Sequence, residues 1–206
     1  HYAEKATSLL RAWFLEPATR MNPHLEFGQG IPGRCQGRGV GIIDTTGFVD
    51  LVDRVLLLRP SIHWTDIDHD GLQAWFDAYM EWLLASEIGQ DEGRARNNHG
   101  TWYDVQVACL ALFAGREDCA CRVLAESAFR RVESQIEADG RQPLELARTR
   151  SLGYSVMNLL GFFDLADLGR RCGLDLWGFE TDDGRGIGKA FHWLVENGLD
   201  GEDWKY

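Results

Sequence analysis

Two short stretches of this chain carry side chains that suit acid–base chemistry beside a carboxylate. Residues 97–103, Asn-Asn-His-Gly-Thr-Trp-Tyr, place two amides, an imidazole and two aromatic rings where an apolar helix is expected to begin. Residues 148–154, Arg-Thr-Arg-Ser-Leu-Gly-Tyr, add two guanidinium groups and a phenol. An amide, an imidazole, a guanidinium and a phenol are together the groups needed to neutralise a carboxylate and to move a proton beside it.

Each of these residues also has an ordinary structural explanation. Asn98 is of a type that commonly caps helices, and His99 can be a satisfied polar group beside that cap. Tyr154 can belong to a helix core with its hydroxyl bonded to a neighbour, and Arg148 and Arg150 can be surface charges at a helix start. Two consecutive amides exceed what one cap requires, and arginines lie close by in sequence, so we favour the functional interpretation.

Hydrophobic periodicity predicts helices almost throughout the chain. Apolar residues recur at helical spacing, and we expect helices over residues 2–15, 46–58, 71–85, 100–114, 118–138, 151–171 and 187–196. No strong hairpin signal interrupts the series. Helices joined by short polar turns predict stacked antiparallel helical hairpins, that is, an all-α fold. No apolar run reaches the length of a membrane span.

One long irregular stretch, residues 16–44, is rich in proline and glycine. A loop of this length in a compact domain is usually functional or disordered. Gln29, Arg34 and Arg38 within it are candidate substrate-binding residues, because guanidinium groups pair well with carboxylates. The glycine run at 37–41 lacks the GxGxxG spacing and a preceding strand, which disfavours a phosphate loop.

Charge and composition limit the partners. The net charge of -11 disfavours nucleic acid, and the acids fall mostly in amphipathic segments whose polar face is solvated. Arginines nevertheless cluster at 34/38, 94/96 and 148/150, each beside a candidate site segment. With 45% hydrophobic residues, the 206 residues can bury a sizeable core, and we expect a single domain over residues 1–206. The chain opens with His1 and shows no signal peptide, so we expect it to be processed or truncated.

The five cysteines show no CxxC pair and no Cys/His metal spacing. Cys119 and Cys121 flank one alanine on an expected helix, where they point in different directions and do not bond each other. We therefore expect buried thiols, and we expect neither a metal nor another cofactor.

The acidic run at residues 66–71 matches the first half of a calcium loop, D-x-D-x-D-G. Its second half fails, because Gln73 stands where an apolar residue is usual and Asp77 where a bidentate glutamate is usual. We favour a helix start capped by Thr65 or Asp66, with acids that complement the helix dipole. A calcium-dependent module remains a weaker hypothesis.

Several motifs in the right order resemble one family. Residues 97–106, Asn-Asn-His-Gly-Thr-Trp-Tyr-Asp-Val-Gln, resemble the signature of the alginate-lyase-like enzymes, polysaccharide lyase family 5 and, more closely, the glucuronan lyases of family 38. The family's long substrate loop resembles five segments here: Arg20-Met21-Asn22-Pro23, Gln29, Ile31-Pro32-Gly33, Gly37-Arg38-Gly39 and Gly41-Ile42-Ile43-Asp44. Residues 143–154 resemble its second catalytic segment. The resemblance covers most of residues 1–180.

This resemblance implies an incomplete α/α toroid of antiparallel helical hairpins with a long substrate loop. Family members are usually longer, so we expect this domain to be a fragment that lacks N-terminal helices and part of the C-terminus. Gly100-Thr101 stands where alginate lyases usually have Ser-Tyr, which favours the glucuronan branch.

The implied activity is a polysaccharide lyase that cleaves a β-1,4-linked uronate polymer by metal-independent β-elimination. Glucuronan is the favoured substrate and mannuronate-rich alginate the alternative. Asn98, Arg148 and His99 would neutralise the sugar carboxylate, with Arg150 open as a substitute for Arg148. Tyr154 would act as base and then as acid; alternatively, His99 is the base and Tyr154 the acid. The weaker candidates, for substrate binding, are Gln29, Arg34, Arg38, Trp102 and Arg150.

A hypothesis of another class is a non-catalytic helical scaffold that binds acidic glycans or a protein partner. We expect an acidic polysaccharide as partner rather than nucleic acid or a membrane, and the sequence does not predict an oligomeric state. Because acidic polysaccharides are met outside the cytoplasm, we expect a secreted or periplasmic protein.

Overall fold

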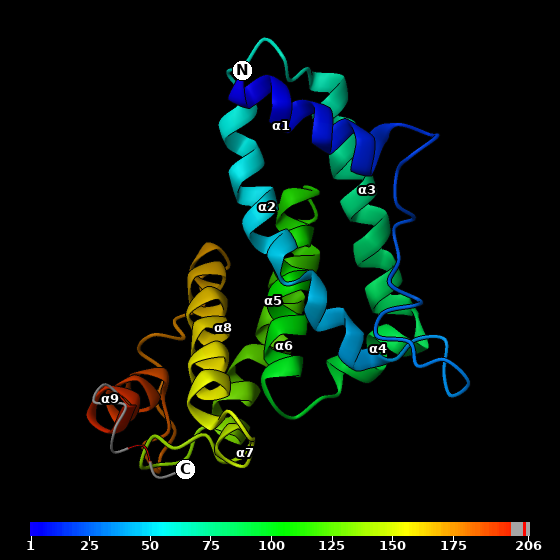
Figure 1. Cartoon of the computed structure of the whole chain (residues 1–206). Coiled ribbons are helices and arrows are strands. Elements are labelled where there is room, and N and C mark those ends of the chain that lie inside the picture. Colours follow the sequence, from blue (N-terminus) through cyan, green and yellow to red (C-terminus); the bar gives the residue numbers. More distant parts are fainter. Residues whose placement is uncertain (199–203, 205–206) are drawn as a thin grey trace. The chain divides into compact units, whose positions relative to one another are not determined.

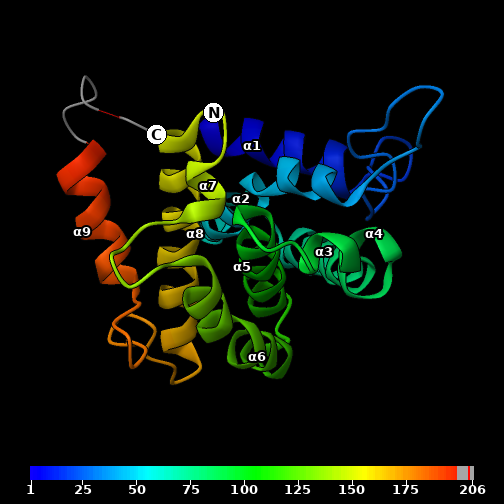
Figure 2. The same cartoon turned by 90° about the horizontal axis from the view of Figure 1, so that it is seen from below.

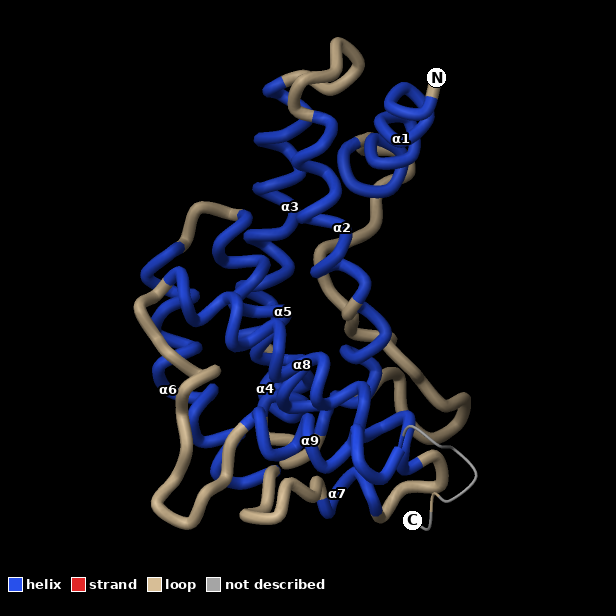
Figure 3. Tube along the Cα trace, turned by 90° about the vertical axis from the view of Figure 1, so that its left-hand side faces the viewer, coloured by secondary structure: helices blue, strands red, loops and turns tan. Residues whose placement is uncertain are grey.

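The computed structural model describes residues 1–198 and residue 204, and in this part of the chain the regular structure is helical (Figures 1 and 3). Extended pairing there is limited to one isolated bridge between Ile31 and Cys35. The all-α prediction is therefore confirmed for the described residues. None of the described helices has the length and apolar character of a membrane span.

The chain divides into two compact units, which are described separately. Unit 1 comprises residues 1–91 and 109–117, and unit 2 comprises residues 92–108 and 118–206. The expected single domain and its closure into a toroid stay predictions.

Unit 1 is built on α1 (Tyr2–Leu10), α2 (Gly47–Val55) and α3 (Asp66–Ala85). A π-helical turn, Arg11–Leu15, prolongs α1, a 3₁₀ turn, Leu56–Leu58, prolongs α2, and another 3₁₀ segment, Gly39–Thr45, ends the irregular stretch. Three helices predicted from periodicity, 2–15, 46–58 and 71–85, are thus confirmed, although α3 starts five residues earlier than its hydrophobic pattern.

The early start of α3 follows from its cap. The Thr65 hydroxyl accepts from the Asp68 amide at 3.2 Å, and the Asp68 carboxylate accepts from the Thr65 amide at 2.9 Å, which forms a capping box. Arg11 donates to both Asp68 oxygens at 2.7 and 2.6 Å and holds the pKa of that carboxyl well below its usual range. Asp66 pairs with Arg59 at 3.1 Å. The acidic run therefore forms a helix start with Thr65 as its cap, rather than a loop.

Aromatic side chains form the core of unit 1. Their rings pack mostly edge to face, with centroids 4.8–6.0 Å apart, and the members are Phe14, Phe48, Trp75, Phe76 and Tyr79. The Trp75 indole donates to the Met21 carbonyl at 2.9 Å, which fixes the irregular stretch against α3. The Tyr79 hydroxyl lies 2.8 Å from the Thr45 hydroxyl, and burial raises the pKa of Tyr79 to about 12.

Unit 2 contains most of α5 (Asn98–Phe113), with α6 (Glu117–Gln135), α7 (Pro143–Leu146), α8 (Ser151–Arg171) and α9 (Ile187–Gly198). Helix α9 packs along α8 (Figures 1 and 2). The predicted helices 100–114, 118–138, 151–171 and 187–196 are confirmed. Helices α4 (Glu87–Gly93) and α7 were not predicted, because they are too short to show a period.

The expectation of buried thiols is wrong for three of the five cysteines. Cys121 of α6 and Cys172, directly after α8, form a disulfide across a sequence separation of 51, with Cα atoms 5.3 Å apart. Cys109 and Cys119 are buried thiols, as expected, whereas the Cys35 thiol is exposed. The pairing depends on how α6 packs against the end of α8, and no spacing of cysteines in the sequence reports that contact.

Replacing Cys172 with serine should lower the free energy of unfolding by about 2–4 kcal/mol, because the bond restricts a long loop of the unfolded chain. Urea titration of the parent and of Cys172→Ser measures this difference. The exposed Cys35 supplies the control, Cys35→Ser, which should change stability little. Equal midpoints for the parent and Cys172→Ser would contradict a structural role for the bond.

Candidate functional site

The chain entering α5 is held by a buried arginine. Arg131 of α6 donates to the carbonyl oxygens of Gly93 at 2.7 Å and Ala95 at 2.5 Å, and its Nε donates to Asp104 at 2.7 Å. A side chain at Gly100 would overlap the Arg131 guanidinium and the Ala95 carbonyl oxygen. Gly100 is therefore required where the first turn of α5 packs against Arg131.

A network of buried amides joins α5, α6 and α8. Gln135 Oε1 accepts from the Thr101 hydroxyl and from Asn158 Nδ2, both at 3.0 Å. Asn158 Nδ2 also donates to Gln142 Oε1 at 2.8 Å, and Gln142 Nε2 donates to the Ser155 carbonyl at 3.1 Å. Since buried polar groups are costly unless bonded, this network fixes how the three helices align.

Glu145 connects the two sequence stretches that suggested chemistry. Its Oε1 accepts from the Asn98 backbone amide at 2.6 Å and its Oε2 from Asn98 Nδ2 at 2.7 Å. Burial raises the pKa of Glu145, while the Asn98 donors and the charges of Arg148 and His99 act in the opposite direction. One carboxyl of α7 thus holds the first residue of α5 and lies within the electrostatic influence of two further candidates.

Asn98 itself is fully buried. Its Oδ1 makes no hydrogen bond to any described residue, and its Nδ2 has a second hydrogen beyond the one given to Glu145. Asn97 has the cap-like position, because its Oδ1 accepts from the His99 amide at 3.3 Å. The capping explanation therefore fits Asn97 better than Asn98.

His99 is paired with a buried carboxylate. Its Nδ1 lies 2.6 Å from Glu92 Oε1, and the side chains are 14% and 2% exposed, respectively. A carboxylate only accepts, so Nδ1 carries the proton and Nε2 is the atom left for another partner. Sequence reasoning missed Glu92, since it lies seven residues before His99 with a helix break between them.

Arg148 and Tyr154 lie against each other. The Arg148 guanidinium carbon is 3.9 Å from the Tyr154 ring centroid, a cation–π contact, and both side chains are partly exposed. Arg150 is exposed, and its carbonyl accepts from the Tyr154 amide at 3.0 Å. Of the two arginines that the sequence left open, Arg148 is the one in contact with Tyr154 and with an effect on Glu145.

The candidate binding residues divide between the two units. In unit 1, Arg38 donates to the Gln29 carbonyl at 3.0 Å and to its side-chain oxygen at 3.3 Å, and Gln29 has a positive φ of 49°. Such a backbone is strained for a residue other than glycine. Arg34 lines a hollow of about 650 Å³ formed by residues 30–36. In unit 2, the Trp102 indole donates to the Met157 carbonyl at 3.0 Å and so joins α5 to α8.

The structure thus brings Asn98, His99 and Arg148 near Glu145, with Tyr154 against Arg148, and separately brings Gln29 and Arg38 together. Among the described residues, no group of three or more His, Cys, Asp or Glu side chains is placed to hold a metal ion. The roles of these residues stay predictions. The missed groups, Glu92 and Glu145, had one sequence signal: each is an acid close to a candidate residue.

The fold and this cluster define an all-helical protein that gathers an imidazole, an amide, a guanidinium and a phenol around buried carboxylates. The sequence profile described as alginate lyase matches residues 1–204. The crystal structure of an alginate lyase from Bacteroides ovatus is 40% identical, with a TM-score of 0.95, and the match covers 100% of this chain and 55% of that chain. No curated protein sequence matches the chain. The chain belongs to the alginate lyase family and spans about half the length of the structure it matches.

The raised pKa of Glu145 gives a prediction for stability against pH. A carboxyl whose pKa is higher in the folded than in the unfolded chain stabilises the folded state at low pH. This contribution is lost as the pH rises from the pKa of the unfolded chain through that of the folded chain. Glutamine resembles the protonated acid, so the melting temperature of the parent minus that of Glu145→Gln should shrink over this interval. A difference that grows with pH would mean that the Asn98 donors outweigh burial.

Proposed function

We propose that this chain forms part of a polysaccharide lyase that cleaves a uronate polymer by β-elimination. Membership of the alginate lyase family supports the reaction class. The observation that carries the proposal is the pair of Asn98–Glu145 hydrogen bonds, which bring residues 97–99 and 145–154 to one place.

In β-elimination a base removes the C5 proton of the uronate, the C4–C5 double bond forms and the O4 link departs. The C5 proton is weakly acidic beside an ionised carboxylate, so that charge must be offset first. Arg148 supplies a fixed positive charge, and His99 adds a donor. Asn98 is kept as a proposed partner of the sugar carboxylate through its second Nδ2 hydrogen, although its side chain is buried in the protein alone.

Tyr154 is the proposed base. The Arg148 guanidinium carbon lies 3.9 Å from the centroid of its ring, which brings a positive charge beside the phenol. In glucuronate and mannuronate the C5 proton and O4 lie on the same side of the ring, so the same phenol can return the proton to O4. Tyr154 would then serve as base and afterwards as acid.

A second assignment makes His99 the base and Tyr154 the acid. The Glu92 contact favours it, because a carboxylate that accepts from Nδ1 leaves Nε2 as a proton acceptor. In this assignment Glu92 orients the ring for proton abstraction.

We propose glucuronan as the substrate, with mannuronate-rich alginate as the alternative. The structural neighbour from Bacteroides ovatus is described as an alginate lyase. Gly100 and Thr101 are buried, and their packing against Arg131 and Gln135 explains them without a sugar. Direct assay of both polymers must therefore decide. Gln29, Arg34, Arg38, Trp102 and Arg150 remain proposed binding residues, and the elimination as written needs no metal.

A secreted or periplasmic location fits this substrate. The Cys121–Cys172 disulfide supports it, since such bonds form and persist mainly in oxidising compartments.

Incubation of the protein with glucuronan or with mannuronate-rich alginate should produce the ultraviolet absorbance of an unsaturated uronate. His99→Ala and Tyr154→Phe should each lower kcat by roughly 10²–10⁴-fold, the usual contribution of a positioned acid or base, with an unchanged circular dichroism spectrum. The exposed Tyr2 supplies the matched control, Tyr2→Phe. A folded protein that binds these polymers but gains no absorbance on either would instead support the non-catalytic glycan-binding scaffold.

Glu92→Gln separates the two assignments of the base. If His99 is the base, this variant should lower kcat by about 10–100-fold with little change in KM, as expected when a group orienting a reactive imidazole is lost. Glu87→Gln, at an exposed position of α4, is the control. An unchanged kcat would assign the proton abstraction to Tyr154.

A further inference from the structure

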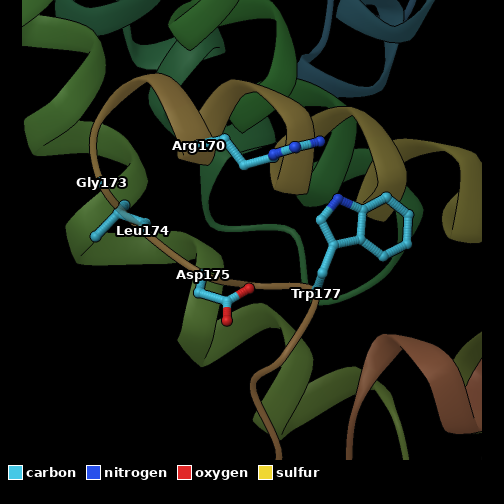
Figure 4. Close-up of a pocket in the computed structure, with 5 residues that line it drawn as sticks. All are labelled: Arg170, Gly173, Leu174, Asp175 and Trp177. Carbon is cyan, nitrogen blue, oxygen red and sulfur yellow. The ribbon is translucent and has the colours of Figure 1, made fainter.

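A hollow of about 680 Å³ opens at the C-terminal end of α8, far along this helix from the candidate site. Figure 4 shows its lining residues: Arg170, Gly173, Leu174, Asp175 and Trp177. Tyr154 lies in the first turn of α8 and Arg170 in the last, so about 24 Å of helix separates them at roughly 1.5 Å per residue. The hollow and Tyr154 both belong to unit 2.

Contacts within the protein hold the turn that lines this hollow in place. Gly173 has a φ of 73°, and the Leu174 amide donates to the Gly169 carbonyl at 2.9 Å, which ends α8 in a tight turn. The adjacent Cys172 is bonded to Cys121, and Leu176 is fully buried. Three anchors within a few residues hold the turn, so a ligand would bind without a large loss of chain entropy.

Trp177 presents a fixed aromatic surface at one side of the hollow. Its side chain is 42% exposed, its Nε1 lies 3.4 Å from Asp167 Oδ1, and its ring packs 5.0 Å from that of Phe163. An indole held along one edge and by a neighbouring ring has little freedom left to lose. A flat, partly exposed aromatic ring is suited to the apolar face of a pyranose, as in other sites that combine apolar walls with a few polar groups.

Charged groups of both signs complete the hollow. The Arg170 side chain is 70% exposed, and its partner Asp167 lies 3.7 Å away, beyond good hydrogen-bonding distance. Figure 4 shows its guanidinium extending toward the indole of Trp177. Asp175 Oδ1 accepts from the Gly178 amide at 2.9 Å, and this bond fixes the carboxylate at the rim of the hollow. Arginine can donate to a carboxylate, and aspartate can accept from a hydroxyl.

We infer that this hollow is an accessory binding site for one sugar unit of the acidic polysaccharide. Trp177 contacts the ring face, Arg170 pairs with the uronate carboxylate, and Asp175 accepts from a ring hydroxyl. The identity of the ligand rests on the proposed function. A second attachment point on the same polymer raises the local concentration of chain near the protein, and so strengthens binding of long chains more than of short ones.

Native electrophoresis through gels that contain the uronate polymer tests the site without cleavage when every protein carries Tyr154→Phe. Adding Trp177→Ala or Arg170→Gln should raise the dissociation constant obtained from the retardation about fivefold or more, equivalent to roughly 1 kcal/mol. Trp13→Ala, at a tryptophan that is 55% exposed in unit 1, is the matched control and should retain full retardation. Unchanged retardation of both hollow variants overturns the inference. Equal retardation of the parent by a neutral β-glucan overturns the assignment to a uronate.

The active protein gives a second readout. Trp177→Ala should raise KM for the polymer about fivefold while leaving kcat/KM on a trisaccharide unchanged, since a short chain does not reach the hollow. Equal losses on polymer and trisaccharide overturn the accessory role, and Arg170→Gln repeats the measurement if Trp177→Ala perturbs the fold. Trp177-dependent retardation without any cleavage by the parent removes the proposed lyase and leaves the binding site. If the parent cleaves the polymer but Trp177→Ala leaves the retardation unchanged, the accessory site is removed and the proposed lyase remains.

Discussion

The buried carboxyl of Glu145 is the group on which the geometry of the candidate site depends. It accepts from both the backbone and the side chain of Asn98, and so fixes the first residue of α5 against the short helix α7. Burying a carboxyl is unfavourable unless donors and positive charges compensate it, and here they come from the site itself, from Asn98, His99 and Arg148. The same interactions therefore determine both the stability of this part of unit 2 and the electrostatics of the proposed site.

Hydrogen bonds between buried amides fix the relative alignment of the helices, which apolar packing alone leaves undetermined. Gln135 and Asn158 bond across α5, α6 and α8, and a sliding of any one helix would leave buried donors and acceptors without partners. Arg131 likewise fixes the backbone that leads to His99, because it donates to the carbonyl oxygens of Gly93 and Ala95. These bonds hold the start of α5, which carries the imidazole, in a fixed position, as the proposed elimination requires.

The long helices and the cap of α3 were predictable, because periodicity and the Thr65 capping box are local properties of the sequence. The clustering of residues 97–103 and 148–154 was expected from the family resemblance. Glu92 and Glu145 were not recognised, since an acid reveals its role only once its burial and partner are known. The Cys121–Cys172 bond was missed for a similar reason, and Gly100 was taken as a mark of substrate preference although it makes room for Arg131.

The disulfide has a consequence for proteolysis. A single cut in the backbone between α6 and the end of α8 would leave the two pieces covalently joined through Cys121 and Cys172. Nicked molecules would then migrate as one band in a denaturing gel until a reductant is added. A break in the connection around α7 would thus leave α6 and α8 covalently associated.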